Sequence, residues 1–236
     1  MTVVNGNFEV GTFSNWRTIG DTRIETAALG TGTSEGTFQA LLTTGASASG
    51  GSVEQSDLEE FLNFSSGLLD NLGNGDATEG SAIKQTFTAN AGDVLTFNWN
   101  FLTSEGTPSS FNDFAFFGVS PFALELADTN SSGFFGTSAV NFSEETGFQT
   151  ISVSIAQTGT YTLNFGVVDV GDTSVDSALI VDNIQVLSFG SIASNNDVLF
   201  GAQGFVGESP LSSSAITNVE QLISSNAIGT GRDATF

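Results

Sequence analysis

The clearest pattern in the chain is a strict alternation of side chains between Val94 and Phe101. Every second residue is large and apolar: Leu95, Phe97, Trp99 and Phe101. Side chains of a β-strand point alternately to its two faces, so this period predicts a strand with one buried face. The run Asn90-Ala91-Gly92-Asp93 just before it predicts a reverse turn. We therefore expect a strand over residues 94–101 with its four apolar residues in the core.

Other segments have the same style and are separated by clusters of Gly, Asn, Asp, Ser and Thr. These segments are residues 83–88, 112–119, 148–155, 161–168 and 178–187. Several short strands with turns between them are typical of a sandwich or barrel rather than of a parallel α/β sheet. We predict an all-β fold, an antiparallel β-sandwich of the jelly-roll type over residues 1–188, with one short inserted helix.

One segment has the helical period instead. Leu58, Phe61 and Leu62 share one helical face, and Ser56 and Glu59 have the spacing of a capping box. We expect a helix over about residues 56–63. A further short turn is expected around Leu68, Leu69 and Leu72, and a polar loop over residues 71–80.

Residues 189–236 differ in character and are expected to form a C-terminal extension outside the sandwich. The extension is rich in Gly and Ser and has a strand-like piece at residues 197–200. Near its end, apolar residues fall at helical spacing: Ile216, Val219, Leu222 and Ile223. An amphipathic helix needs a surface to cover its apolar face. We predict an assembly element that contacts a neighbouring copy; the alternatives are a secretion signal and a cover for its own sandwich.

The charge balance excludes one class of partner. The chain has 26 acidic and 4 basic residues, a formal net charge of −22. Nucleic-acid binding needs a basic face that neutralises phosphates, so we expect no nucleic-acid partner. The sequence also lacks an apolar run of about 18 residues, the length that a membrane span needs, so we expect no membrane insertion.

The chain contains neither Cys nor His. Disulfides, thiolate nucleophiles and the usual transition-metal sites are thereby excluded. The remaining metal ligands are oxygens, which suit a hard cation such as Ca²⁺. Bound calcium would also relieve the repulsion between converging carboxylates. The alternative is an acidic, solvated surface without specific ions.

The N-terminus predicts an export route without a cleaved leader. Met1 is followed directly by strand-like residues, with no basic segment and no long apolar segment. An acidic, Gly-rich, Cys-free chain is typical of bacterial cargo exported by an uncleaved C-terminal signal. The alternative is a chain whose leader has been removed. In both cases we expect an extracellular or cell-surface location in bacteria.

Two short motifs at the ends of residues 1–188 resemble those of a known family. Asn5-Gly6-Asn7-Phe8-Glu9 is followed by Trp16, and Asp182-Asn183-Ile184 lies in the last predicted strand. The pair resembles the calcium-binding, galactose-binding-like jelly rolls that include many carbohydrate-binding modules. The resemblance implies that the first and last strands are neighbours and share a structural Ca²⁺ ion. Glu9 and Asp182 would be its side-chain ligands, helped by backbone near Asn7 and near Arg23–Glu25, so Glu25 joins the expected set.

A second resemblance covers the middle of the chain. The stretches 79–87, 97–105, 112–116 and 166–179 look like a group of bacterial exported proteins, many of which end in an exosortase-type sorting tail. This chain lacks the apolar sorting helix and basic end of that group, so membrane anchoring is not carried over.

Acidic residues in these stretches fall at the ends of predicted strands. They are Glu105, Asp113, Asp169, Asp172 and Asp176. If the strands are neighbours, the carboxylates crowd one rim, and like charges so close resist joint ionisation unless a cation neutralises them. We expect a second calcium site there; the alternative is a flexible acidic loop.

Two functional hypotheses follow. The first is an extracellular, calcium-stabilised structural protein that self-assembles into a filament, sheath or surface layer, and its support is the extension, the calcium-suited chemistry and the 22 Phe. The alternative is a carbohydrate-binding or adhesive module with a polysaccharide partner, which rests on the family resemblance. Sugar sites need exposed flat aromatics, whereas Trp16 and Trp99 fall at core positions and Tyr161 begins an alternating strand. No residue pattern singles out a catalytic site, so we expect no enzyme.

Overall fold

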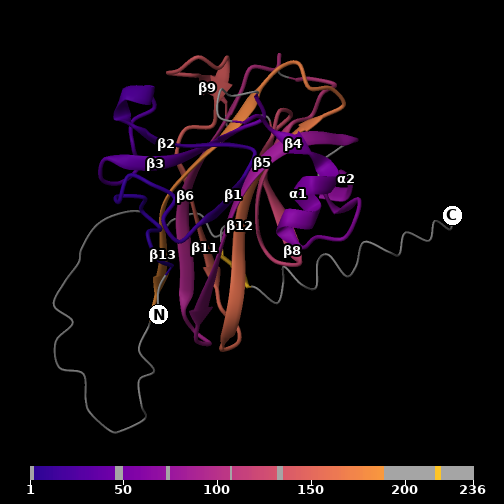
Figure 1. The fold of residues 1–236 in the computed structure, drawn as a ribbon. Helices are drawn as coiled ribbons and strands as arrows, with labels where there is room; N and C mark the ends of the chain where they lie inside the picture. Colours follow the sequence, from indigo (N-terminus) through magenta and orange to yellow (C-terminus); the bar gives the residue numbers. More distant parts are fainter. Residues whose placement is uncertain are drawn as a thin grey trace, which may run out of the picture.

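The protein is an antiparallel β-sandwich, as predicted, in which two sheets pack face to face (Figure 1). The structure is a computed structural model, and it describes residues 3–45, 50–72, 75–106, 108–131, 135–188 and 216–218. Within these residues one sheet, sheet A, has six strands and the other, sheet B, has eight.

Sheet A has the strand order β1-β5-β12-β7-β8, with β4 also paired to β5. Its strands are β1 (Arg17–Ile19), β4 (Val53–Glu54), β5 (Ala77–Ala89), β7 (Phe114–Val119), β8 (Phe122–Asp128) and β12 (Gly159–Val170). The long strands β5 and β12 form its centre and pair along most of their length. Val168 pairs with Gly80 and Val170 pairs with Ala77, so Thr78 and Glu79 lie opposite the single residue Asp169, and β5 carries a bulge there.

Sheet B has the order β14-β11-β6-β13-β3-β2, with β10 paired to β6 and to β9. Its strands are β2 (Asp21–Thr26), β3 (Phe38–Thr43), β6 (Val94–Thr103), β9 (Gly136–Thr137), β10 (Glu144–Glu145), β11 (Gln149–Ser154), β13 (Ser177–Leu187) and β14 (Ile216–Asn218). Its centre is formed by β6 and β13, and β13 has an irregular register between Asp182 and Gln185. All strand pairs are antiparallel except that of β11 with β14.

The main core lies between the sheets and is built by the alternation that predicted it. Leu95, Phe97, Trp99 and Phe101 are all buried there, which confirms the expected core face of β6. Phe rings take much of the volume: Phe97 packs edge-on against Phe165 at 4.8 Å between centroids. Trp16 is buried in the same core, as expected from its position in the sequence.

Two smaller apolar clusters lie on the outer faces of the sheets. Helices α1 (Gln55–Leu62) and α2 (Leu68–Leu72) cover sheet A, where Leu58, Leu62 and Leu69 pack on Phe114 and Phe116 (Figure 1). On sheet B, Leu41, Leu102, Ala178 and Ile180 are covered by Leu29 of the short 3₁₀ helix η1 (Ala27–Leu29) and by the loop with Val140 and Phe142.

The helix prediction was right in position and wrong in its cap. The N-cap residue of α1 is Glu54, which makes no side-chain capping hydrogen bond, so the expected capping box of Ser56 and Glu59 does not form. Glu59 instead accepts hydrogen bonds from the backbone N–H groups of Gly67 and Leu69. It therefore stabilises the connection between α1 and α2, an interaction that sequence spacing does not reveal.

Two further expectations need correction. The predicted loop over residues 71–80 is too long, because α2 extends to Leu72 and β5 begins at Ala77. The predicted helix beginning at Ile216 is wrong at its start, because Ile216–Asn218 form β14 along the edge of β11. Pairing to an open sheet edge suits the β-branched Ile216 and Thr217. Residues 197–200 and 219–223 lie outside the described residues, and the boundary at residue 188 stays a prediction.

Candidate functional site: a cleft on sheet B and two groups of acidic residues

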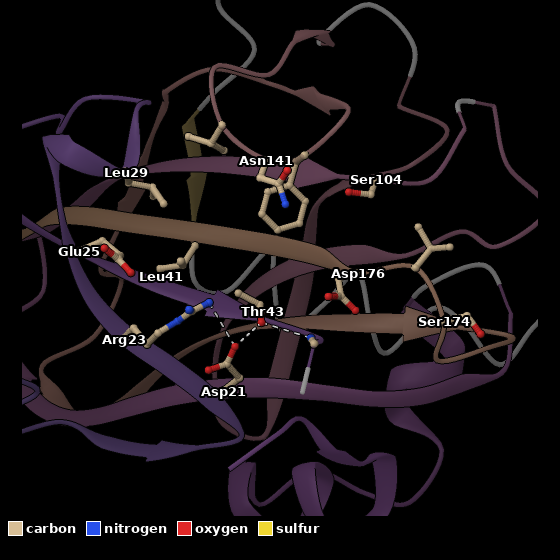
Figure 2. A pocket seen from close by; sticks show the side chains of 14 residues that line it. Asp21, Arg23, Glu25, Leu29, Leu41, Thr43, Ser104, Asn141, Ser174 and Asp176 are labelled. Atoms are coloured by element: carbon tan, nitrogen blue, oxygen red, sulfur yellow. Dashed lines mark hydrogen bonds and ion pairs between the residues drawn. The ribbon is translucent and has the colours of Figure 1, made fainter. Parts of the chain in front are cut away.

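A cleft lies on the outer face of sheet B. In β2 and β3, Asp21 pairs with Thr43 and Arg23 pairs with Leu41, so these side chains share the face that points away from the main core. The cleft has a volume of about 670 Å³. It is lined by Asp21, Arg23, Glu25, Leu29, Leu41, Thr43, Gly45, Ser104, Val140, Asn141, Phe142, Ser174, Val175 and Asp176. Figure 2 shows Arg23, Glu25, Asn141 and Asp176 around an apolar floor with Leu29 and Leu41.

The polar groups at one end of the cleft are held by hydrogen bonds. Asp21 is buried, and its Oδ2 accepts a hydrogen bond from Thr43 Oγ1 at 2.5 Å. Arg23 Nη2 donates to the same oxygen at 3.3 Å (Figure 2). The Arg23 side chain as a whole is 46% exposed. Asp21 is anchored from the other sheet as well, since its N–H donates to Ser81 Oγ. These contacts fix Arg23 at the edge of the cleft with donors that still face solvent.

The electrostatic character of the cleft is acidic. Partial burial raises the pKa of Asp176, and the nearby charge of Asp21 raises it further. Three carboxylates and one guanidinium therefore surround a half-buried ring, Phe142, and the amide of Asn141. Such a lining can donate and accept hydrogen bonds around a polar ligand, and its apolar floor can contact that ligand's C–H groups.

The first group of predicted calcium ligands lies at the N-terminal segment and β13. Ile184 N donates to Gly6 O at 2.9 Å, so this segment lies beside the last long strand, as the resemblance implied. Both carboxylates hold the segment 34–38 by its backbone. Glu9 Oε1 accepts from Thr37 N and Phe38 N, and Asp182 Oδ2 accepts from Ser34 N, Ser34 Oγ and Glu35 N.

The other two residues of that group have different positions. Asn7 Oδ1 accepts a hydrogen bond from Glu9 N, so it orders the turn that carries Glu9. Glu25 lines the cleft on sheet B. Across the described residues, no three acidic side chains converge where they could hold a metal ion. Calcium at Glu9 and Asp182 stays a prediction.

The second predicted group divides into a buried part and an exposed part. Asp113, Asp169 and Glu105 are all buried. Asp172 accepts a hydrogen bond from Ser174 N in a turn, and Asp176 lines the cleft on sheet B. Of the five predicted residues, Asp113 and Asp169 are buried neighbours inside the sandwich, and calcium at this group stays a prediction.

The buried pair of this group has unusual electrostatics. Burial raises the pKa of Asp169 to about 9, and the charges of Asp113, Glu79 and Asp176 act in the same direction. Burial also raises the pKa of Asp113 to about 6, opposed by hydrogen bonds from Ser177 and Val170. Without a neutralising partner, at least one of the two carboxyls therefore retains its proton near pH 7.

Sequence reasoning missed the cleft and most of its lining, including Arg23, Asn141 and Phe142. The available signal was the run Asp21, Arg23, Glu25, which puts a charged residue at every second position of one strand. The Phe residues of loop-like segments differ in exposure: Phe111 is 37% exposed, whereas Phe135 packs against Phe101 of the core. Phe122 is half-buried in β8, and Phe134 lies outside the described residues.

Comparisons with known proteins give structural likeness only. No protein-family model and no curated protein matches the chain. The chain is similar to the carbohydrate-binding module TmCBM61 in complex with β-1,4-galactotriose, at 13% identity and a TM-score of 0.44, over 78% of this chain and 96% of that one. It is also similar to the K1 cleaved adhesin domain of Lys-gingipain from Porphyromonas gingivalis W83, at 13% identity and a TM-score of 0.43, over 80% and 98%.

A third similar structure is the mannan-recognising module TmCBM27, at 13% identity and a TM-score of 0.37, over 79% of this chain and 94% of that one. At these identities and scores, none of the three carries a conclusion about what this chain binds. In the part of the chain that the structure describes, no helix is long and apolar enough to cross a membrane.

Proposed function

We propose that this protein is a non-catalytic module that binds a short oligosaccharide in the cleft on sheet B. The observation that carries the proposal is the lining of that cleft. Planar polar groups, the guanidinium of Arg23, the carboxylate of Glu25 and the amide of Asn141, stand around an apolar floor with the ring of Phe142. A sugar presents pairs of adjacent hydroxyls together with apolar C–H patches, and this lining complements both.

The charge of the cleft restricts the class of oligosaccharide that it could bind. Its carboxylates outnumber its one guanidinium, and the whole chain carries a net charge of −22. An anionic ligand would be repelled. A neutral oligosaccharide is favoured, because carboxylates accept hydrogen bonds from its hydroxyls without needing a charge on the ligand. An extracellular or cell-surface location in bacteria would suit this ligand and stays a prediction.

The test is calorimetric titration with neutral oligosaccharides. β-1,4-galactotriose and manno-oligosaccharides are the first probes, since similar structures bind galactotriose and mannan. Glu25→Gln and Asn141→Ala should each weaken binding about tenfold or more, because each removes hydrogen bonds to the ligand. Glu54→Gln is the matched control, since Glu54 is exposed at the start of α1 on the other sheet.

Two results would reject the proposal. Equal affinity in Glu25→Gln and in wild type would place the ligand elsewhere. Cleavage of the oligosaccharide during the titration would make the protein a glycosidase, which two carboxylates can be in principle. Product analysis by chromatography after prolonged incubation separates binding from hydrolysis.

Self-assembly is a second candidate, favoured by a different observation. β14, from the predicted extension, pairs in parallel with β11 at the edge of sheet B. A segment that adds a strand to a sheet edge can do so within its own chain or on a second copy. Exchange between copies would join the sandwiches head to tail.

A further inference from the structure

At one end of the sandwich, the inward-facing side chains of five neighbouring chain segments change from apolar to oxygen-bearing. Towards the middle of the core, their inward residues are apolar, for example Phe101 of β6, Leu179 of β13 and Val167 of β12. The next inward position along each strand carries an oxygen instead. These positions are Thr44, Thr103, Asp113, Asp169 and Ser177, and all five residues are buried. The core therefore ends in a layer of oxygen-bearing side chains, which we call the oxygen layer.

Sheet pairing brings these residues together from both sheets. In sheet B, Ser177 pairs with Thr103, and Ser177 N donates to Thr44 Oγ1 at 3.0 Å. In sheet A, Val168 pairs with Phe114, so Asp169 and Asp113 follow directly on neighbouring strands. The two sheets meet where Ser177 Oγ donates to Asp113 Oδ2 at 2.6 Å. The other oxygen of Asp113 accepts from Val170 N at 3.0 Å.

Within the oxygen layer, Asp169 is notable because its carboxylate lacks well-formed hydrogen bonds. It is 1% exposed, and neither of its carboxylate oxygens makes a hydrogen bond of normal geometry with a described residue, although Thr44 and Asp113 lie close enough to affect its pKa. Its strand alternates regularly here, so Asp169 points inward between the outward-facing Val168 and Val170; the bulge lies opposite, at Thr78 and Glu79 of β5, and Thr78 Oγ1 donates to Asp169 O.

Asp169 also lacks a cationic partner among the described residues. Among the basic residues in the described part of the chain, Arg23 pairs with Asp21, and Arg17 and Lys84 both lie over the ring of Phe61. A buried carboxylate without a hydrogen bond or a counter-charge is strongly unfavourable, so native structures supply a partner. Burial and the neighbouring charge of Asp113 raise the pKa of Asp169, which agrees with a missing positive partner.

We infer that the oxygen layer holds a single Ca²⁺ ion between Asp113 and Asp169. Hydroxyl oxygens of the layer and nearby backbone carbonyls complete a set of oxygen ligands, the chemistry that Ca²⁺ takes. Two carboxylates neutralise its charge. The ion lies at the end of the main core and links β7 and β12 of sheet A to β13 of sheet B. The inference is independent of the proposed oligosaccharide binding, because the cleft lies on the outer face of sheet B.

The test compares melting temperatures of the full chain in excess EGTA and in excess CaCl₂. For wild type, calcium should raise the melting temperature by roughly 5–10 °C at a concentration about 100 times its Kd, since only the folded state holds the ion. Asp169→Asn should abolish this rise. In EGTA the same variant should melt at or above the wild-type temperature, because the variant no longer carries an unpartnered buried carboxyl group. A purely structural role for Asp169 would instead lower the melting temperature in both conditions.

Asp172→Asn is the matched control, because it changes the charge equally and its side chain accepts only a turn hydrogen bond from Ser174 N. It should keep the full calcium response. If Asp169→Asn does not fold, Asp113→Asn takes its place for the calcium response alone, which it should abolish. Its melting temperature in EGTA is not compared with wild type, because Asp113 also accepts hydrogen bonds from Ser177 Oγ and Val170 N.

Three results would overturn the inference. Wild type could melt equally in EGTA and in calcium, in which case the two carboxyls share a proton instead of an ion. Asp169→Asn could keep the calcium response. The response could also be lost in Glu9→Gln and retained in Asp169→Asn, which would place the ion at the first predicted group.

Discussion

At the scale of single residues, this acidic chain uses carboxylates as acceptors for its own backbone. Asp182 is fully buried, and four donors meet its two oxygens: three on Oδ2 from Ser34 and Glu35, and Asn183 N on Oδ1. Glu9 and Glu59 hold other connections in the same way. A charged acceptor forms stronger hydrogen bonds than a neutral one, so each of these side chains fixes a segment that has no regular structure of its own.

Asp182→Asn tests this role. The asparagine amide presents N–H groups to donors of the segment 34–35, so we expect a loss of about 2–4 kcal/mol in the free energy of unfolding. Urea denaturation would measure it, and Asp76→Asn, at an exposed position, should change stability little. The loss should persist in EGTA. A loss that appears only in the presence of calcium would instead support the predicted ion at Glu9 and Asp182.

At the scale of elements, the N-terminal segment depends on one close backbone approach. Gly6 lies beside β13, where its carbonyl accepts from Ile184 N, and a Cβ built on Gly6 would lie 2.1 Å from Ile184 O. The atom in the way is backbone, which cannot swing aside as a flexible side chain could. The glycine in Asn5-Gly6-Asn7 is therefore required for close contact with the irregular stretch of β13.

Gly6→Ala should separate this segment from β13. We expect a loss of about 1–3 kcal/mol in the free energy of unfolding, the usual cost of forcing an extra carbon into a packed position. Gly136→Ala is the control, because a Cβ there would meet no atom within 4 Å. Equal urea midpoints for Gly6→Ala and wild type would mean that the contact contributes nothing to stability.

At the scale of the whole molecule, the sandwich has a layered interior with a main core and two outer clusters. The outer face of sheet B combines an apolar cluster with a cleft of about 670 Å³. The edge of the same sheet at β11 is occupied by β14 from the extension. An uncovered strand edge is a template for pairing with another chain, so the source of that strand decides whether the molecule stays single.

Deletion of residues 189–236 tests the assembly hypothesis. The truncated sandwich should fold and remain a monomer by light scattering, while the full chain should form larger particles as strands exchange between copies. Electron microscopy in calcium and in EGTA would show whether the ion matters. Monomers in both proteins at high concentration would refute self-assembly and leave the binding-module proposal as the remaining function.

The sequence by itself determined the sandwich, because alternation is a local property. Each strand's core face follows from its own residues, and Leu95, Phe97, Trp99 and Phe101 lie where their period put them. The helix over residues 55–62 was also predictable, since its apolar residues recur at the helical period. The contact between Gly6 and Ile184 was expected on a different ground, the resemblance of two motifs to a known family.

Only the tertiary structure decided which polar residues meet. The cleft combines β2, β3 and the loop at residues 140–142, which are far apart in the chain. Among the five acids predicted to share a rim, Asp113 and Asp169 became buried neighbours, whereas Asp176 faces the cleft. The order of strands in sheet A and the register of β12 with β7 make that difference. The physical reason is that strand pairing and register depend on the packing of both sheets at once, which no single segment encodes.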